Sequence, residues 1–217
     1  MSGIILMSDP KITATPVQDC GEPLVDVRRE RALLVDARLQ DAANAFAHLR
    51  EGVVNRLMDA QGLLPDGLRL LFVEGYRPLS LQRTYFEGYS KKLQSLHPEW
   101  SAGQVHAAAS RFVSPPEIAP HSAGAAVDLT LADIDGRELD MGTLMNASPE
   151  TSAGACYTDA DNISAEAREN RKILGAALTA AGLVNYATEW WHWSLGDRYW
   201  ALATGADHAF YGPRELT

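Results

Sequence analysis

Cysteine is scarce in this sequence, and long apolar runs are missing. The 217 residues include two cysteines, Cys20 and Cys156. Two cysteines cannot form a four-thiolate metal site or a framework of several disulfides, so we expect free thiols, with one bridge between them as the alternative. No stretch approaches the roughly 20 apolar residues that span a bilayer, and the apolar run at residues 4–7 is too short for a signal-peptide core. We therefore expect a cytoplasmic protein.

Basic residues are too few to balance the acidic ones. Lys and Arg number 19 against 28 Asp and Glu, which gives a net charge of −9. This charge repels a phosphate backbone and an anionic membrane, so we expect neither nucleic acid nor a membrane as a partner. A content of 46% hydrophobic and 22% charged residues is that of a globular protein. We expect one domain over residues 1–217, with poor order in residues 1–20, and the composition predicts no particular oligomeric state.

The spacing of apolar residues predicts helices and strands in an irregular order. Apolar residues in steps of three and four predict a long helix over residues 32–61. Further along, the pattern predicts a strand at 68–74, a helix with Ser80 as its N-cap, a helix between 98 and 113, a strand at 126–131, a surface excursion at 139–162, a helix from Ser164 to Gly182, and strands at 183–186 and 190–195. Strands and helices without regular alternation favour an α+β fold, with helices packed on a small antiparallel sheet.

Three short segments combine ionisable residues with apolar surroundings. They are EGYRP at 74–78, HSAGAAVD at 121–128 and EWWHW at 189–193. Each segment places an ionisable residue on a predicted strand or at its end. Ionisable groups are seldom buried without a partner, so we expect these residues to satisfy one another or a metal ion.

His121 and Asp128 form the first candidate pair. The predicted strand at 126–131 directs Asp128 to one face, and Gly124 allows the chain to turn back so that His121 approaches it. An imidazole nitrogen and a carboxylate oxygen are both ligands for a divalent ion such as zinc. The alternative is a hydrogen-bonded pair that only supports the turn.

His192 in the third segment would supply another protein ligand. Together His121, Asp128 and His192 leave one tetrahedral position for water, which is the arrangement of a catalytic zinc site. Glu189 would face the opposite side of a regular strand, so we expect a bend at the strand entrance that brings its carboxylate toward this water. There Glu189 could take a proton from the water and pass it to a leaving amine. The alternative for Glu189 is a surface charge.

Arg77 lies between Tyr76 and Pro78, at the end of a predicted buried strand. A guanidinium at this place can donate to a carbonyl oxygen as negative charge develops on it, which is the role of an oxyanion stabiliser. The other interpretation is a salt bridge from Arg77 to Glu74 or to Asp128 that holds the loop.

In this order, the segments EGYRP, HSAGAAVDLTL, LDMGT at 139–143 and EWWHW resemble the zinc D-alanyl-D-alanine dipeptidases, a group that includes the vancomycin-resistance dipeptidases. The similarity extends over about residues 68–195. It implies one zinc ion per chain and an α+β fold shared with D,D-carboxypeptidases and the hedgehog-type signalling domain. By motif position it implies that Glu189 is the general base and acid and that Arg77 stabilises the transition state. It also implies that the zinc ligands are His121, Asp128 and His192.

Two positions depart from the pattern of that group. The resistance enzymes have serine just before the first zinc histidine, where this chain has Ala119 and Pro120. They have an acidic residue shortly after the MGT stretch, where Asn146 stands here. A neutral amide binds a substrate ammonium less strongly than a carboxylate does, so specificity for D-Ala-D-Ala is less firmly implied than hydrolysis.

Two classes of function follow from these residues. The first is a zinc peptidase in which water on the metal, deprotonated by Glu189, attacks the carbonyl between two small D-amino acids. Trp190, Trp191 and Trp193 suggest a confined pocket and so the free D-alanyl-D-alanine dipeptide as substrate. A D,D-carboxypeptidase that acts on longer peptidoglycan peptides is the alternative within this class. The second class is a non-catalytic binding module that zinc stabilises, and it predicts that Glu189 is dispensable.

Overall fold

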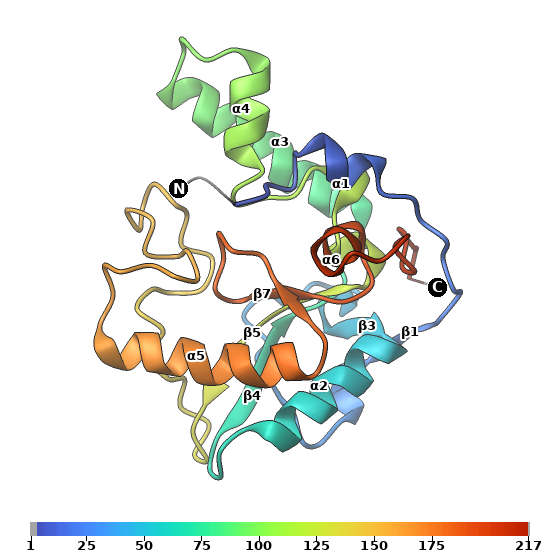
Figure 1. Cartoon of the computed structure of the whole chain (residues 1–217), viewed down its shortest axis with the longest axis vertical. Coiled ribbons are helices and arrows are strands. Elements are labelled where there is room, and N and C mark those ends of the chain that lie inside the picture. The colour runs from blue at the N-terminus through green and yellow to red at the C-terminus, as the bar shows by residue number, and fades with distance from the viewer. Residues whose placement is uncertain (1–3, 217) are drawn as a thin grey trace.

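A computed structural model describes residues 4–216 of the chain, and its centre is a five-stranded sheet (Figure 1). The strands lie in the order β2 (Leu34–Val35), β4 (Arg69–Glu74), β5 (Ala126–Ala132), β7 (His192–Ser194) and β6 (Val184–Asn185). Neighbouring strands are antiparallel except β2 and β4, which run parallel. The combination of helices with this sheet confirms the predicted α+β class, while the parallel edge pair departs from the expected antiparallel pairing.

The two faces of the central strand β5 differ in chemistry. Its side chains alternate, so that residues such as Leu129 point to one face and residues such as Asp128 point to the other. Two helices, α2 (Glu51–Leu63) and α5 (Ala165–Ala180), lie against each other and cover the apolar face (Figure 1). The opposite face, which we call the polar face, is left for charged side chains.

A β-bulge in β4 aligns charged residues on the polar face. The register of β4 against β5 shifts between Phe72 and Glu74, so that Glu74 lies opposite Asp128. In an unbroken ladder Val73 would take this place, and Glu74 would point into the apolar core. On the other side of β5, His192 of β7 also pairs with Asp128. One row across three strands therefore carries Glu74, Asp128 and His192.

Helices and a long loop surround the polar face. Helices α3 (Leu79–Leu96) and α4 (Ala102–Ala109) form a hairpin that projects from the body of the molecule (Figure 1). Helix α6 (Arg198–Thr204) packs against α1 (Pro10–Ala14). The excursion at residues 139–162 contains neither helix nor strand, as expected from its composition.

The long helix predicted over residues 32–61 is wrong except for its last part, which is α2. The residues before α2 form β2, the 3-10 turn η2 (Ala45–Ala47) and β3 (His48–Arg50). Strand β3 pairs with β1 (Leu24–Asp26), and a short 3-10 turn, η1 (Val27–Arg29), follows β1. A turn-rich segment therefore replaces more than half of the predicted helix.

Side-chain hydrogen bonds explain this difference. The carboxylate of Asp41 accepts from the backbone N–H groups of Ala43 and Phe46, each at 2.8 Å. Such local bonds satisfy backbone donors in a turn and compete with helix formation. Asn44 adopts a left-handed conformation with φ of 55°, which also ends any helix here. Apolar residues at intervals of three and four therefore occur here in a segment that does not form a helix.

Two smaller expectations also need correction. Poor order was expected in residues 1–20, but residues 4–20 include α1, and Met7 and Ile12 are each 0% exposed. Residues 1–3 lie outside the described part of the chain. Helix α3 begins at Leu79 rather than after Ser80, because Pro78 is its N-cap.

The cysteines agree with the expectation of free thiols. Cys20 is exposed, Cys156 is buried, and both are free thiols, so the alternative of one bridge is wrong. Within residues 4–216, no helix has the length and apolar character needed to cross a membrane.

Gly124 provides a test of how the turn before β5 is built. It follows the 3-10 turn η4 (His121–Ala123) with φ of 65°, and a Cβ atom there would collide with Cδ2 of Leu24. We expect Gly124→Ala to lower the free energy of unfolding by about 1–3 kcal/mol in urea denaturation, because it combines left-handed strain with a clash. Gly88→Ala in α3, where a Cβ meets open space, is the control and should not destabilise. Equal effects of the two substitutions would contradict this account.

Candidate active site

Backbone and side-chain hydrogen bonds join two of the motifs into one unit. Nδ1 of His121 lies 2.6 Å from the carbonyl oxygen of Gly75. The N–H of Arg77 donates to the carbonyl of His121 at 3.2 Å, and the hydroxyl of Ser122 donates to the carbonyl of Arg77 at 2.9 Å. The segment after β4 therefore holds the segment before β5, which fixes His121 relative to Arg77.

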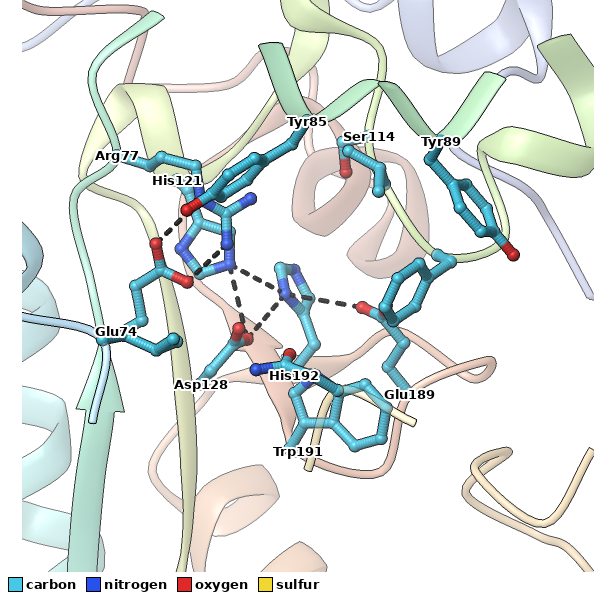
Figure 2. Close-up of a pocket in the computed structure, with 14 residues that line it drawn as sticks. Glu74, Arg77, Tyr85, Tyr89, Ser114, His121, Asp128, Glu189, Trp191 and His192 are labelled. Atoms are coloured by element: carbon cyan, nitrogen blue, oxygen red, sulfur yellow. Dashed lines mark hydrogen bonds and ion pairs between the residues drawn. The ribbon is translucent and has the colours of Figure 1, made fainter. Parts of the chain in front are cut away.

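The structure brings His121, Asp128 and His192 together on the polar face (Figure 2). Nε2 of His121 lies 3.2 Å from Nδ1 of His192 and 3.3 Å from Oδ1 of Asp128, and the latter two atoms are 3.0 Å apart. Ligand atoms at about 2.0–2.1 Å from a tetrahedral zinc ion lie about 3.3–3.4 Å from one another. The triangle of donor atoms is therefore close to the size that a metal ion requires.

The chemistry of the donor atoms also fits a cation. A carbonyl oxygen only accepts hydrogen bonds, so Nδ1 of His121 carries the proton that is shared with Gly75. In the neutral ring, Nε2 then presents a lone pair to the Asp128 carboxylate, and only the protonated ring could donate a hydrogen bond to it. A divalent cation at this place would be held by this lone pair, by the carboxylate and by Nδ1 of His192 together. The bond to Gly75 orients the His121 ring as a metal ligand needs.

Burial and charge set the protonation states of these ligands. Burial alone would raise the pKa of Asp128, but the charges and hydrogen bonds of His121 and His192 outweigh it and hold this pKa below 3.8. Burial lowers the pKa of His192 and outweighs the attraction of Asp128. An ionised carboxylate and a neutral imidazole are the forms that bind a metal ion.

Glu189 lies just before β7, where the chain bends. The N–H of His192 donates to the carbonyl of Glu189 at 3.2 Å, and Oε2 of Glu189 lies 3.8 Å from Nδ1 of His192 (Figure 2). Burial raises the pKa of Glu189 well above 4.5, and the charge of Asp128 raises it further, while Arg77 lowers it. A buried carboxylate with a raised pKa beside metal ligands is suited to proton transfer.

Arg77 forms a salt bridge to Glu74, which is one of the two roles that the sequence left open for it. Nε donates to one carboxylate oxygen at 2.8 Å and Nη2 to the other at 2.5 Å. Burial would lower the pKa of Arg77, but Glu74 outweighs it and keeps the guanidinium charged. Cζ of Arg77 also lies 5.1 Å from the centre of the Tyr85 ring, which gives a cation–π contact at the cavity wall.

These side chains line a cavity of about 310 Å³. Sequence patterns did not indicate several residues of its wall, which are Leu39, Tyr85, Tyr89, Phe112, Val113 and Ser114. A signal existed for two of them, because Tyr85 and Tyr89 lie on the apolar stripe of the helix after EGYRP. Of the three tryptophans expected to confine the pocket, Trp191 lines the cavity. Trp190 and Trp193 belong to the apolar core without lining the cavity, so only Trp191 can confine a substrate there.

Comparison with known proteins identifies the family. The model of the peptidase M15 family, described as D-Ala-D-Ala dipeptidase, matches residues 37–209. The chain belongs to this family. It is 30% identical to a D-alanyl-D-alanine dipeptidase of Synechocystis, over 92% of this chain and 94% of the relative. A D-alanyl-D-alanine dipeptidase of Enterococcus faecium is 30% identical, over 61% of this chain and 64% of that one.

One solved structure among those that match is the vancomycin-resistance D,D-pentapeptidase VanY in complex with Zn(II). It superposes with a TM-score of 0.42 at 17% identity, over 80% of this chain and 88% of that chain. Membership of the peptidase M15 family makes the chain an enzyme, a metallopeptidase whose hydrolytic reaction is related to peptidoglycan. The prediction of an enzyme is therefore confirmed, and the alternative of a non-catalytic binding module is wrong.

The two departures from the pattern of the family lie at different places in the structure. Asn146 lines the cavity and adopts a left-handed conformation with φ of 64°. Pro120 is the N-cap of η4 and is not among the residues that line the cavity. Asn146 is therefore the departure that a substrate would meet.

Metal-free protein allows a test of the raised pKa of Glu189. Because this pKa is raised in the folded chain, the unfolded chain loses its proton first, so stability falls as the pH rises above 4.5. Glutamine cannot ionise. We expect metal-free Glu189→Gln to melt at a higher temperature than wild type at about pH 7 and to match it at about pH 4, as measured by circular dichroism. Glu87→Gln on the exposed side of α3 is the control, and identical melting temperatures of Glu189→Gln and wild type at neutral pH would contradict the prediction.

Proposed function

We propose that this enzyme hydrolyses the D-alanyl-D-alanine dipeptide with a zinc ion held by His121, Asp128 and His192. One observation carries the proposal: Oε2 of Glu189 lies 3.8 Å from Nδ1 of His192, beside the ligand triangle and in the same cavity. Metal ligands and a neighbouring carboxylate with a raised pKa are the groups that metal-assisted hydrolysis of an amide needs. Membership of the D-Ala-D-Ala dipeptidase family supports the same reaction.

The ligand set is the reason for proposing zinc. Two imidazoles and one carboxylate suit this ion and leave one of four positions open. Zinc at this place would polarise the scissile carbonyl and lower the pKa of a bound water to about 7. We infer one zinc ion per chain, because His121, Asp128 and His192 are the cluster of this kind within residues 4–216.

Glu189 would act first as general base and then as general acid. Its carboxylate faces the ligand triangle, so it can take the proton of a water placed there (Figure 2). Burial and the charge of Asp128 raise its pKa, so it holds a proton more readily than an exposed glutamate does. The proton can then pass to the leaving amine as the peptide bond breaks.

Arg77 would stabilise the negative charge that develops on the carbonyl oxygen. Glu74 keeps the guanidinium charged and holds it at the cavity wall. Charges in a buried cavity are weakly screened, so a fixed donor there is worth more than in water. Removal of a donor of this type usually lowers kcat by about 10²–10³-fold.

The size of the cavity supports a small substrate. Its volume of about 310 Å³ is near the lower end of the range for small-molecule sites, and the rings of Tyr85, Tyr89 and Trp191 take up part of its wall. The free dipeptide is therefore the preferred substrate. The cytoplasmic location, and the expectation that neither nucleic acid nor membrane is a partner, stay predictions of the sequence.

A neighbouring hollow favours a second candidate function, a D,D-carboxypeptidase that acts on longer peptidoglycan peptides. A second cavity, of about 360 Å³, shares Leu39, Glu74 and Tyr85 with the first. Tyr85 is 44% exposed, so its side chain has room to move. A longer peptide could place its preceding residues in this second cavity.

Two variants separate metal binding from proton transfer. His192→Ala removes a ligand and should lose both zinc and activity, whereas Glu189→Gln should keep zinc and lose about 10²–10⁴-fold in kcat. Metal analysis by mass spectrometry and a D-Ala-D-Ala hydrolysis assay measure the two effects. His208→Ala is the control, because His208 does not line the cavity, and it should match wild type in both. Retained turnover in Glu189→Gln would reject the role of Glu189.

Substrate length decides between the two candidate functions. We expect kcat/KM to be at least about tenfold higher for D-Ala-D-Ala than for a pentapeptide that ends in D-Ala-D-Ala, because the cavity is small. Release of D-alanine from each substrate gives the comparison. Tyr85→Ala removes part of the wall that the two cavities share, so it should reduce the difference in kcat/KM between the two substrates. Tyr85→Phe should preserve this difference. Faster cleavage of the pentapeptide by wild type would favour the carboxypeptidase instead.

A further inference from the structure

Helix α3 buries a glutamine at a position that suits an apolar side chain. The buried residues of α3 are Gln82, Tyr89 and Leu93, and Gln82 is 1% exposed. A buried amide without hydrogen bonds destabilises a fold by roughly 1–3 kcal/mol, so glutamine is rare at such positions unless its partners are present. The hydrogen-bond partners of Gln82 therefore indicate why a glutamine occupies this buried position.

Both ends of the Gln82 amide are hydrogen-bonded. Oε1 accepts from Nη1 of Arg77 at 2.8 Å, and Nε2 donates to the carbonyl oxygen of Ser114 at 2.7 Å. Ser114 begins the proline-rich segment that leads to His121. Proline rings restrict the backbone of this segment, so it is a stiff support. Gln82 thus connects the guanidinium of Arg77 to the chain segment that carries a candidate metal ligand.

The hydrogen bonds of Arg77 can be counted in full. A guanidinium has five N–H groups. Glu74 accepts one from Nε and one from Nη2, and Gln82 accepts one from Nη1. One N–H therefore remains on each terminal nitrogen, and Arg77 lines the cavity. Glu74 holds one edge of the guanidinium, while Gln82 holds the nitrogen that Glu74 does not contact.

We infer that Gln82 is a positioning residue, which holds the guanidinium of Arg77 so that its free N–H groups face the carbonyl oxygen of the substrate. The inference rests on the proposed function, because it assigns Arg77 to the transition state. Small errors in the placement of a catalytic group can cost up to about 10²-fold in rate, so a second support for the guanidinium has a large effect. Gln82 itself does not line the cavity.

The test is the substitution Gln82→Met, which keeps the length of the side chain and removes both hydrogen bonds. We expect kcat for D-Ala-D-Ala to fall about 10–100-fold, with KM changed less than about twofold and zinc content unchanged. Gln94→Met, farther along α3 and away from the cavity, is the matched control and should retain wild-type kinetics. Wild-type kcat in Gln82→Met would overturn the inference.

A double-mutant cycle shows whether Gln82 acts through Arg77. In an Arg77→Lys background, Gln82→Met should cause little further loss, because the group that it positions is already gone. A full additional loss would overturn the inference. Affinity for a phosphinate analogue of the dipeptide, measured by calorimetry, should fall in Gln82→Met by the same factor as kcat/KM, because this analogue resembles the transition state. Unchanged affinity would contradict a role at that stage.

Two further results keep the inference separate from folding and from the proposed function. If Gln82→Met does not fold, Gln82→Glu keeps the shape and an acceptor for Arg77, so it should fold and retain a larger part of kcat than Arg77→Lys does. A loss in Gln82→Glu as large as that in Arg77→Lys would overturn the inference. If wild type loaded with zinc does not hydrolyse D-Ala-D-Ala, the proposed function fails, whereas normal turnover in both wild type and Gln82→Met rejects only the role of Gln82.

Discussion

Two cross-strand pairs at the centre of the sheet determine the rest of the site. Glu74 lies opposite Asp128, and Asp128 lies opposite His192, so the three residues stand in one row on one face. Directly opposed residues have Cβ atoms about 4.5–5.5 Å apart, which is close enough to share a metal ion or an ion pair. A slip of one residue would move these charges to the face that α2 and α5 cover. Packing on the apolar face therefore holds the polar face in register.

Several charges can be buried together here because most of them have partners. Glu74 pairs with Arg77, and Asp128 lies against His121 and His192. Glu189 is different, since its nearest ion-pair contact is at 3.8 Å from His192, and its pKa is raised as a result of burial. The least compensated carboxylate of the site is thus the one suited to move a proton, and stability and reactivity oppose each other at this residue.

Local patterns made part of this structure predictable. The strand β5, the Ser164 cap of α5 and the three motifs depend on neighbouring residues, so periodicity and residue type revealed them. The bulge in β4 could not be predicted, because it arises from pairing with another strand. Residues 32–50 were misleading because hydrogen bonds of Asp41 compete with a helical spacing. The role of Gln82 depends on contacts with Arg77 and Ser114 that sequence spacing does not indicate.

The two interpretations of Arg77 that the sequence left open are compatible with each other. Both interpretations treat the guanidinium as a single charge, but this group has several separate N–H donors in a fixed plane. The bidentate bond to Glu74 uses one edge of that plane and leaves other N–H groups free. A lysine would present one charge without a fixed plane, so pairing with Glu74 would draw it away from the cavity. In the role proposed for Arg77, the salt bridge to Glu74 would also direct the free N–H groups toward the substrate, which a lysine could not do.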